Sequence, residues 1–446
     1  MKKLLSVLLA LLMVFTLVGC SSSTTTTTET TEGEEGKVLN IWTWNEEFWG
    51  FLTKYYADEV IDETTAKKGD VTIKRTTYPS DGGAYQDALD AALLAQADAA
   101  ADDKVDIFLA EADYIVKYTN SDATLDVATI GVTDFSNTYN YTVQAASDAN
   151  GKVKGVSFQC CPAAVIYRRS VAKDVLGTDD PAQVQEAMAD WDKFNALAAQ
   201  CKEKGYYMIS TTNATYRIYS NNVTSPWVKD GKLNIDANID KWMSQSEDFV
   251  KNGYTHYTSN IWGDEATADM AIDGKALCYF GPAWYYNFSM GKAQATDGTG
   301  TSGDWAICQG PQAYFWGGTW MLAATGTDNP TMVADIMNTF INDEDVCAKL
   351  IENEAQFTNN QKVNAKYAED PNFANAFLGG QNDVAVYVEL AKNIKFENVT
   401  NYDQLCNEGL QKYYEEYLLG QVASKEDAIK NFKDYIKTTY PSITVE

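Results

Sequence analysis

Apolar strand patterns alternate with amphipathic helical patterns near the start of the chain. Residues 38–44 and 71–77 are rich in β-branched or aromatic residues, which favours strands. Residues 46–60 and 85–101 repeat their apolar positions at helical spacing. Residues 105–110, VDIFLA, form a continuous apolar run that is typical of a fully buried strand. This β-α-β-α-β order predicts a parallel sheet with helices on both faces.

A second series of alternating elements begins near the turn signal Asn150-Gly151. Its predicted strands are 163–167, 206–210, 276–280 and 304–308, and helical patterns separate them. A later strand, 319–324, precedes helices at 330–341, 384–393, 402–419 and 425–438. The two series predict two α/β lobes, and the chain after residue 319 returns to both of them. This arrangement predicts a hinged pair of lobes with a ligand cleft between them.

The N-terminus has the features of an export signal. Lys2 and Lys3 precede the apolar run 4–17, which is too short to cross a membrane. The sequence Leu17-Val18-Gly19-Cys20 resembles a bacterial lipobox, which implies that Cys20 becomes the lipidated N-terminus. The alternative is an ordinary secretory signal with an incidental cysteine, but no Ala-x-Ala site follows. Residues 21–36 contain no hydrophobic residue and predict a flexible tether.

Length, charge and cysteine content restrict the class of protein. A chain of 446 residues is too long for one ordinary core, and a formal charge of −27 argues against nucleic acid or anionic lipid as partners. Cysteines other than Cys20 are odd in number and lack CxxC metal spacing. We expect no bridge between Cys160 and Cys161, and we expect buried free thiols at Cys201, Cys278, Cys308 and Cys347.

Motifs for catalysis are missing from the sequence. The chain has a single histidine, His256, and no HExxH, Walker or GxSxG pattern. Carboxylates are abundant, so a two-acid glycosidase stays open as an alternative. We expect a binding protein rather than an enzyme, with no cofactor and no metal ion.

Aromatic residues beside acids and glycines follow several predicted strands. Sugars present apolar faces and a rim of hydroxyls, which proteins contact with aromatic platforms and with carboxylates or amides. Trp44, Trp284 and Trp316 adjoin turns, acids and glycines, which favours ligand contact. We expect four other tryptophans to be core residues: Trp42, Trp191, Trp242 and Trp305.

Several stretches together resemble the carbohydrate-binding lipoproteins of ABC importers, the maltose-binding-protein-like family. They are LNIWTWNEEF, VDIFLAEADYIVKY, GTDDPAQVQEAMADWDKFNALAAQCKEKGY, GKALCYFGPAW, GDWAICQGPQAYFWGGTW and EDAIKNFKDYIKTTYP. The resemblance implies a two-lobed α/β fold of the periplasmic-binding-protein type (type II), with hinged lobes that close on a ligand. We expect a signal peptide at 1–20, a tether at 21–36, a first lobe at 37–150 and 312–355, and a second lobe at 151–311 and 356–446.

The resemblance also implies the positions of the ligand-binding residues. They are Trp44, Glu46 and Glu47 after the first strand, Glu111 and Asp113 after VDIFLA, Gln159 near a crossing, Trp284 and Tyr285 in the GPAWYY turn, and Trp316, Gly317 and Gly318 at another crossing. A stacking aromatic that many relatives carry in the tail cannot be aligned among Tyr402, Tyr413 and Tyr414, so the length of the sugar chain stays open.

These expectations combine into a monomeric solute-binding lipoprotein on the extracytoplasmic face of the bacterial cell membrane. It would capture a carbohydrate, an oligosaccharide by our prediction, and deliver it to the permease of an ABC importer. It would touch the membrane only through its lipid anchor. A binding protein for a non-sugar solute such as a peptide is a further alternative. Arginine is scarce, and we expect Arg217 at the surface rather than at an acidic ligand.

Overall fold

The computed structural model describes residues 35–446. Cys20, the signal segment and nearly all of the predicted tether lie outside the described residues. Within the described part, no helix is both long and apolar enough to span a bilayer.

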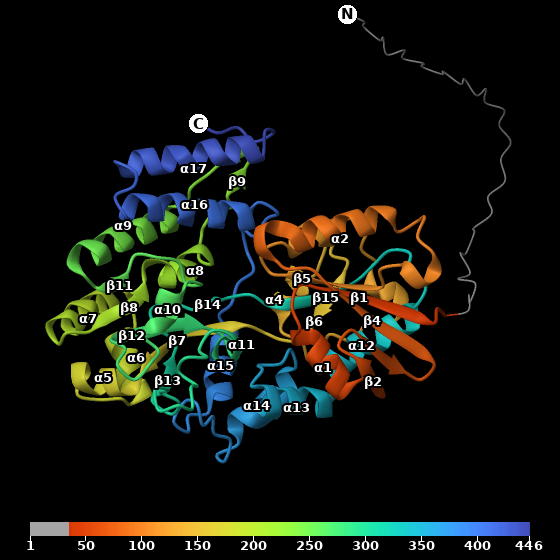
Figure 1. The fold of residues 1–446 in the computed structure, drawn as a ribbon, viewed down its shortest axis with the longest axis horizontal. Helices are drawn as coiled ribbons and strands as arrows, with labels where there is room; N and C mark the ends of the chain where they lie inside the picture. Colours follow the sequence, from red (N-terminus) through yellow and green to blue (C-terminus); the bar gives the residue numbers. More distant parts are fainter. Residues whose placement is uncertain (1–34) are drawn as a thin grey trace, which may run out of the picture. The chain divides into compact units, whose positions relative to one another are not determined.

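Seven strands form the first sheet, in the order β2-β3-β4-β1-β5-β15-β6 (Figure 1). Strand β1 pairs in parallel with both β4 and β5, whereas β15 runs antiparallel between β5 and β6. Because β1 and β5 are parallel, their carboxyl ends lie at the same edge of the sheet, and so do the loops that follow them. The bounds are β1 Val38–Thr43, β2 Glu59–Asp62, β3 Thr65–Lys68, β4 Val71–Thr77, β5 Ile107–Glu111, β6 Gly155–Ser157 and β15 Thr319–Ala323.

Apolar helix faces cover this first sheet. The Phe48 ring of α1 lies 5.5 Å from Phe158 and 5.1 Å from Phe340 of α12, so the two helices share one core with the sheet. The associated helices are α1 Glu47–Tyr55, α2 Ala84–Ala95, α3 Ile115–Thr119, α4 Asn140–Ala145, α12 Pro330–Asn342 and α13 Glu344–Glu354.

The second sheet has the order β11-β8-β12-β7-β13, and β14 pairs with the start of β7. Its strands are β7 Pro162–Arg168, β8 Tyr207–Thr211, β11 Thr255–Tyr257, β12 Ala276–Gly281, β13 Trp305–Cys308 and β14 Tyr314–Phe315. The helices of this part are α5 Arg169–Leu176, α6 Pro181–Ala187, α7 Trp191–Glu203, α8 Tyr216–Ser220, α9 Ala237–Asn252, α10 Asp264–Ala268 and α11 Trp284–Phe288. A separate hairpin joins β9 Val228–Lys229 to β10 Lys232–Leu233.

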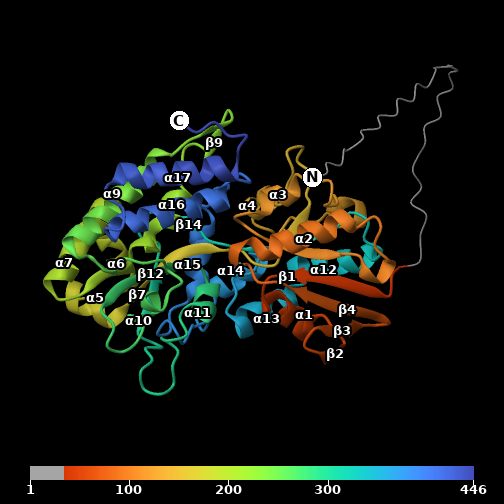
Figure 2. The same cartoon turned by 45° about the horizontal axis from the view of Figure 1, so that its top comes forward.

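The tail helices lie mainly with the second sheet. Helices α16 Asp403–Leu418 and α17 Lys425–Thr439 pack beside α9 in both views of the ribbon (Figures 1 and 2). Helices α14 Gln361–Glu369 and α15 Asp383–Ala391 precede them, and α15 packs on β7.

Three crossing segments, 158–161, 314–318 and 356–359, connect the two sheets and lie side by side. Cys160 N–H donates to Phe357 O at 2.9 Å, and Trp316 N–H donates to Cys161 O at 3.1 Å. Strand β6, at residues 155–157, belongs to the first sheet although the predicted boundary at 150 assigns it to the second lobe. The residue ranges of the lobes stay a prediction.

Two predicted helices are shorter than the sequence pattern suggests. The pattern predicts a helix over 46–60, but α1 ends at Tyr55 because residues 59–62 pair as β2 with β3. Helix α2 ends at Ala95 rather than at residue 101.

Core predictions for single residues have mixed outcomes. Trp242 and Trp305 are fully buried, whereas Trp42 and Trp191 are only partly buried and pack against the edge of the core. All seven cysteines of the described residues are buried and free, including the adjacent pair Cys160 and Cys161.

Candidate functional site

Glu47 lies at the first turn of α1, directly after β1, and faces two crossing segments. Its Oε2 accepts a hydrogen bond from Gln159 Nε2 at 3.3 Å, and its Oε1 accepts one from Gln356 Nε2 at 3.2 Å. Gln159 Nε2 also donates to Thr319 Oγ1 at 3.2 Å. Burial raises the pKa of Glu47 to about 7, against the opposing effect of the two amide hydrogen bonds. The carboxyl group therefore has neutral partners only.

Glu111 ends β5, the strand next to β1. Its Oε2 accepts the backbone N–H of Asp113 at 2.7 Å. Burial raises the pKa of Glu111 to about 8. The negative charge of Asp113 adds to this rise, and the nearby Arg217 opposes it. The other oxygen, Oε1, points toward Gly317: a Cβ added to Gly317 would lie 3.5 Å from it.

Asp113 forms a bidentate ion pair with Arg217 of α8. Nη1 of Arg217 donates to Oδ1 of Asp113 at 2.6 Å, and Nη2 donates to Oδ2. The two side chains are only 20% and 22% exposed, and the guanidinium carbon lies 5.9 Å from the ring centroid of Trp316. The prediction that Arg217 lies at the surface is wrong, because Asp113 from the other sheet binds it in the space between the lobes.

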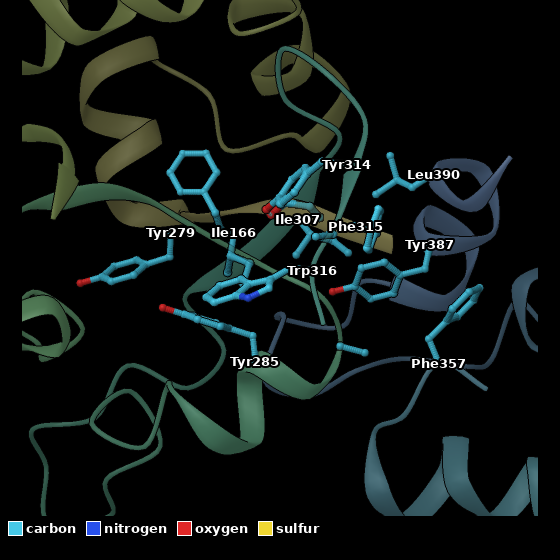
Figure 3. Close-up of a cluster of buried hydrophobic side chains, with 14 of the residues drawn as sticks. Ile166, Tyr279, Tyr285, Ile307, Tyr314, Phe315, Trp316, Phe357, Tyr387 and Leu390 are labelled. Atoms are coloured by element: carbon cyan, nitrogen blue, oxygen red, sulfur yellow. Dashed lines mark hydrogen bonds between the residues drawn. The ribbon is translucent and has the colours of Figure 1, made fainter. Parts of the chain in front are cut away.

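Three aromatic rings from the second lobe and a crossing segment meet beside these acids. Trp316 lies 5.7 Å from Tyr285 between ring centroids (Figure 3). The Trp284 ring centroid lies 5.2 Å from that of Trp316. Trp284 Nε1 donates to Trp316 O at 3.3 Å. Trp316 is 6% exposed and Tyr285 4%, whereas Trp284 is partly exposed.

Gly317 and Gly318 allow the chain to turn at this crossing. Both have positive φ, +71° and +114°, where a side chain causes strain. A Cβ on Gly317 would also lie 3.4 Å from Trp284 Cζ2, and one on Gly318 would lie 3.1 Å from Trp320 Cζ3. The glycines thus leave room for the Trp284 ring and for Glu111.

Of the predicted residues, Glu46 stands apart from this group and Trp44 lies at its border. The Glu46 side chain is 82% exposed and lies 3.3 Å from Nη1 of Arg75. Trp44 packs edge-on against Tyr85 at 5.6 Å and Tyr114 at 6.1 Å, so it borders the group from the side of the first sheet. We call the convergent set the inter-lobe site: Trp44, Glu47, Glu111, Asp113, Gln159, Arg217, Trp284, Tyr285, Trp316 and Gln356.

Sequence reasoning missed three residues at or beside this site. Gln356 follows α13 in a crossing segment and has no local signal. Cys161 lies close enough to Glu47 and Glu111 for both to raise its pKa, and its Sγ lies 3.5 Å from Gln159 Oε1. Trp262 is 67% exposed yet lies 5.5 Å from Trp316, and its position directly before Gly263-Asp264-Glu265 was a usable signal.

Little free space borders the inter-lobe site in this conformation. One cavity beside Trp316 and Tyr285 encloses about 10 Å³, and one beside Asp113 and Arg217 about 20 Å³. Each is about the size of one water molecule. A larger cavity of about 190 Å³ lies behind Gln356, between α13 and α15. No group of ligating side chains that could hold a metal ion occurs within residues 35–446. Neither of the two small cavities at the site therefore has room for a sugar ring in this conformation.

Solved structures of similar fold support the two-lobed architecture. A crystal structure described as an extracellular solute-binding protein of family 1 has a TM-score of 0.71 at 16% identity, covering 90% of this chain and 99% of its own. A binding protein from B. animalis subsp. lactis in complex with β-1,6-galactobiose has a TM-score of 0.66 at 15% identity, covering 92% and 100%. A Bifidobacterium longum protein in complex with lacto-N-biose has a TM-score of 0.65 at 13% identity, covering 93% and 100%.

These likenesses confirm the predicted fold class. None of the curated proteins matches the chain. The family model described as bacterial extracellular solute-binding protein matches residues 59–375, which include the second sheet, every strand of the first sheet except β1, and all three crossing segments. The chain belongs to the bacterial extracellular solute-binding proteins.

Proposed function

We propose that this solute-binding protein captures a carbohydrate, an oligosaccharide, in the inter-lobe site and delivers it unchanged to the permease of an ABC importer. The observation that carries the proposal is the meeting of two carboxyl groups and an amide with a group of aromatic rings. Glu47, Glu111 and Gln159 provide the polar rim, and Trp284 and Trp316 provide apolar ring surface.

The chemistry of the site fits a saccharide better than a peptide. Carboxylates and amides accept hydrogen bonds from sugar hydroxyls, while indole rings cover the apolar faces of sugar rings. The B. animalis and B. longum proteins, in complex with β-1,6-galactobiose and lacto-N-biose, support the same class of ligand here. Their identities of 15% and 13% leave the identity of the sugar to experiment.

A thermal-shift screen of residues 37–446 against saccharides, peptides and metal ions tests the ligand class. A true ligand at 100 times its Kd raises the stability of the folded state by about 2.7 kcal/mol. Stabilisation by peptides or metal ions alone would refute a saccharide ligand. The best saccharide is then incubated with the protein and analysed by mass spectrometry. Cleavage of that saccharide would show a glycosidase instead of a receptor.

The family is extracellular, and we propose that lipid on Cys20 anchors this member as a monomer at the outer face of the cell membrane. The lipobox-like sequence and the polar segment 21–36 support the anchor. Co-purification of the permease with the lipidated protein from membranes tests the partner.

A further inference from the structure

Acidic groups outnumber basic ones around the inter-lobe site. Asp403 and Glu408 of α16 lie close enough to Asp113 and Arg217 for their charges to interact, and they add to Glu47, Glu111 and Asp113. Among residues 35–446, Arg217 is the one cation whose charge acts on Glu111, and Asp113 already occupies its guanidinium fork. Glu47 and Glu111 are therefore left without a positive partner.

Further acceptors at the edge of this acidic group lack donors. Oε1 of Gln86 has no hydrogen-bond partner within the described residues, although Gln86 is only 8% exposed. Gln86 Nε2 donates to Gln404 Oε1 at 3.0 Å, and Gln404 in turn reaches Glu408, so this amide lies beside the acids of α16. The Tyr114 hydroxyl is also buried and unpartnered, on a side chain that is 8% exposed and interacts electrostatically with Glu111. Burying a polar group without a hydrogen-bond partner costs free energy. A ligand with several donors would remove this cost by donating to these acceptors.

An ammonium group has the missing properties. It carries three donors and no acceptor, supplies the absent positive charge, and is attracted to aromatic faces such as Trp44 and Tyr114. A neutral hydroxyl could also donate to Glu111, but it brings no positive charge and so does not stabilise the ionised form of this partly buried carboxyl group. The negative charge of the whole protein, −27, also attracts cations toward the site.

We infer that the saccharide of this receptor is an amino sugar with a free, protonated amine, and that the amine binds at Glu111. This inference rests on the proposed function and specifies its ligand. The indoles of Trp284 and Trp316 cover the sugar ring, and the amine takes the position in which Glu111 Oε1 has no partner of its own. The Glu47 carboxyl, held by the amides of Gln159 and Gln356, accepts from neighbouring hydroxyls.

Proton exchange follows from the same arrangement. The groups that face Glu111 are Asp113 and Arg217 on one side and Glu408, Tyr114 and Cys161 around it, whereas Glu47 faces Gln159, Gln356 and Cys161. Burial raises the pKa of both carboxyls, so near neutral pH each holds a proton for part of the time in the empty protein. An ammonium ligand displaces that proton, and calorimetry in two buffers of different ionisation enthalpy detects its release.

Matched ligands provide the test. Glucosamine, galactosamine and the trimer of β-1,4-linked glucosamine are titrated into residues 37–446 by calorimetry at pH 7, beside glucose, galactose and cellotriose as hydroxyl counterparts and the N-acetylated forms as uncharged ones. We expect at least one free amine to bind at least tenfold more tightly than both of its counterparts. Equal or tighter binding of the neutral members in every pair overturns the inference but leaves the proposed function standing. Binding of no saccharide of either kind, with a response to spermidine or peptides, refutes the proposed function as well.

Two variants connect the preference to Glu111. Glu111→Gln should reduce the amine preference to less than threefold, because the amide cannot carry the negative charge that an ammonium group needs. The control Glu59→Gln removes an exposed acid on β2 and should leave the preference unchanged. If Glu111→Gln retains the full preference, or if Glu59→Gln loses it equally, the amine does not bind at Glu111.

Discussion

Asp113 and Arg217 join the two lobes through a bidentate ion pair, from the loop after β5 to helix α8. Both side chains are about four-fifths buried, so each charge depends on the other for compensation. Trp316 lies on one side of the guanidinium group, and the pair therefore connects both sheets to a crossing segment.

Removing one partner of this pair should destabilise the contact between the lobes. We expect Asp113→Asn to lower the free energy of unfolding by about 1–3 kcal/mol, because Arg217 stays partly buried without a counter-charge. The double variant Asp113→Asn/Arg217→Gln should lose less unfolding free energy than the two single variants lose together. Urea denaturation of the four proteins measures this coupling energy. The exposed pair Asp345–Lys349 on α13 is the control, with a coupling below about 0.5 kcal/mol, and an equally small value for Asp113–Arg217 would contradict the prediction.

Variants of Trp316 and Trp262 should distinguish a role in folding stability from a role in ligand binding. Trp316 is 6% exposed, so Trp316→Ala should cost about 3–5 kcal/mol of folding stability in the absence of ligand. Trp262 is 67% exposed, and Trp262→Ala should change stability by less than about 0.5 kcal/mol while weakening saccharide binding. Thermal melting and calorimetric titration of each variant distinguish the two roles. A Trp262 variant that binds its saccharide normally would show that Trp262 does not contact the ligand.

Trp284 is the matching test within the proposed stacking platform. Its ring is partly exposed beside Trp316, so Trp284→Ala should reduce affinity by about 1–3 kcal/mol and affect melting less than Trp316→Ala does. Trp191→Ala provides a control away from the inter-lobe site, because Trp191 stacks on Tyr219 at 4.2 Å between centroids. Its expected result is lower stability with unchanged affinity.

Stability of the empty protein should depend on pH through Glu47 and Glu111. Both carboxyls ionise near pH 4.5 in the unfolded chain, whereas burial raises their pKa to about 7 and about 8 in the folded protein. Between these values the folded state binds more protons, so stability is greatest below pH 4.5 for these groups and falls as pH rises to about 8. We expect Glu111→Gln to reduce this loss of folding stability by on the order of 1–3 kcal/mol. Melting curves from pH 5 to 8.5 measure it, and identical slopes for both proteins would show that Glu111 does not titrate in this way.

Lipidation at Cys20 should control the location of the protein. We expect the wild-type protein in the membrane fraction, and Cys20→Ala either released or left unprocessed with its signal segment. Cell fractionation and mass spectrometry of the N-terminal peptide measure both outcomes. Cys160→Ala is the control for loss of a cysteine elsewhere. Wild-type protein free in the medium, without lipid, would refute the anchor.

The sequence pattern predicted much of the sheet framework because strand and helix periodicities are local. The strand at 71–77 has the predicted bounds, and the acid after VDIFLA lies where the end of a parallel strand must place it. The hairpin of β2 and β3 escaped prediction because residues 59–62 are all exposed and lack the apolar alternation that marks a half-buried strand.

Residues brought together by the crossing segments could not be paired from the sequence. Gln356 meets Glu47 only because the segments 158–161 and 356–359 bond to each other, a contact that no local pattern encodes. Arg217 looked like a surface residue because its short helix gives no sign that a carboxylate from the other lobe binds it. Trp316 was predicted at the site, but its nearly complete burial depends on rings from α11.

The crossing of the chain between sheets also determines the order in which the protein can fold. Strand β15 lies between β5 and β6, and Thr319 pairs with Glu111, although the whole second sheet separates them in sequence. A chain that emerges from the export machinery N-terminus first therefore cannot complete its first sheet until residue 323 has crossed. Until then β5 and β6 present unpaired edges, which are sites for aggregation. Late completion of the first sheet therefore leaves these two edges open in every folding intermediate that lacks β15.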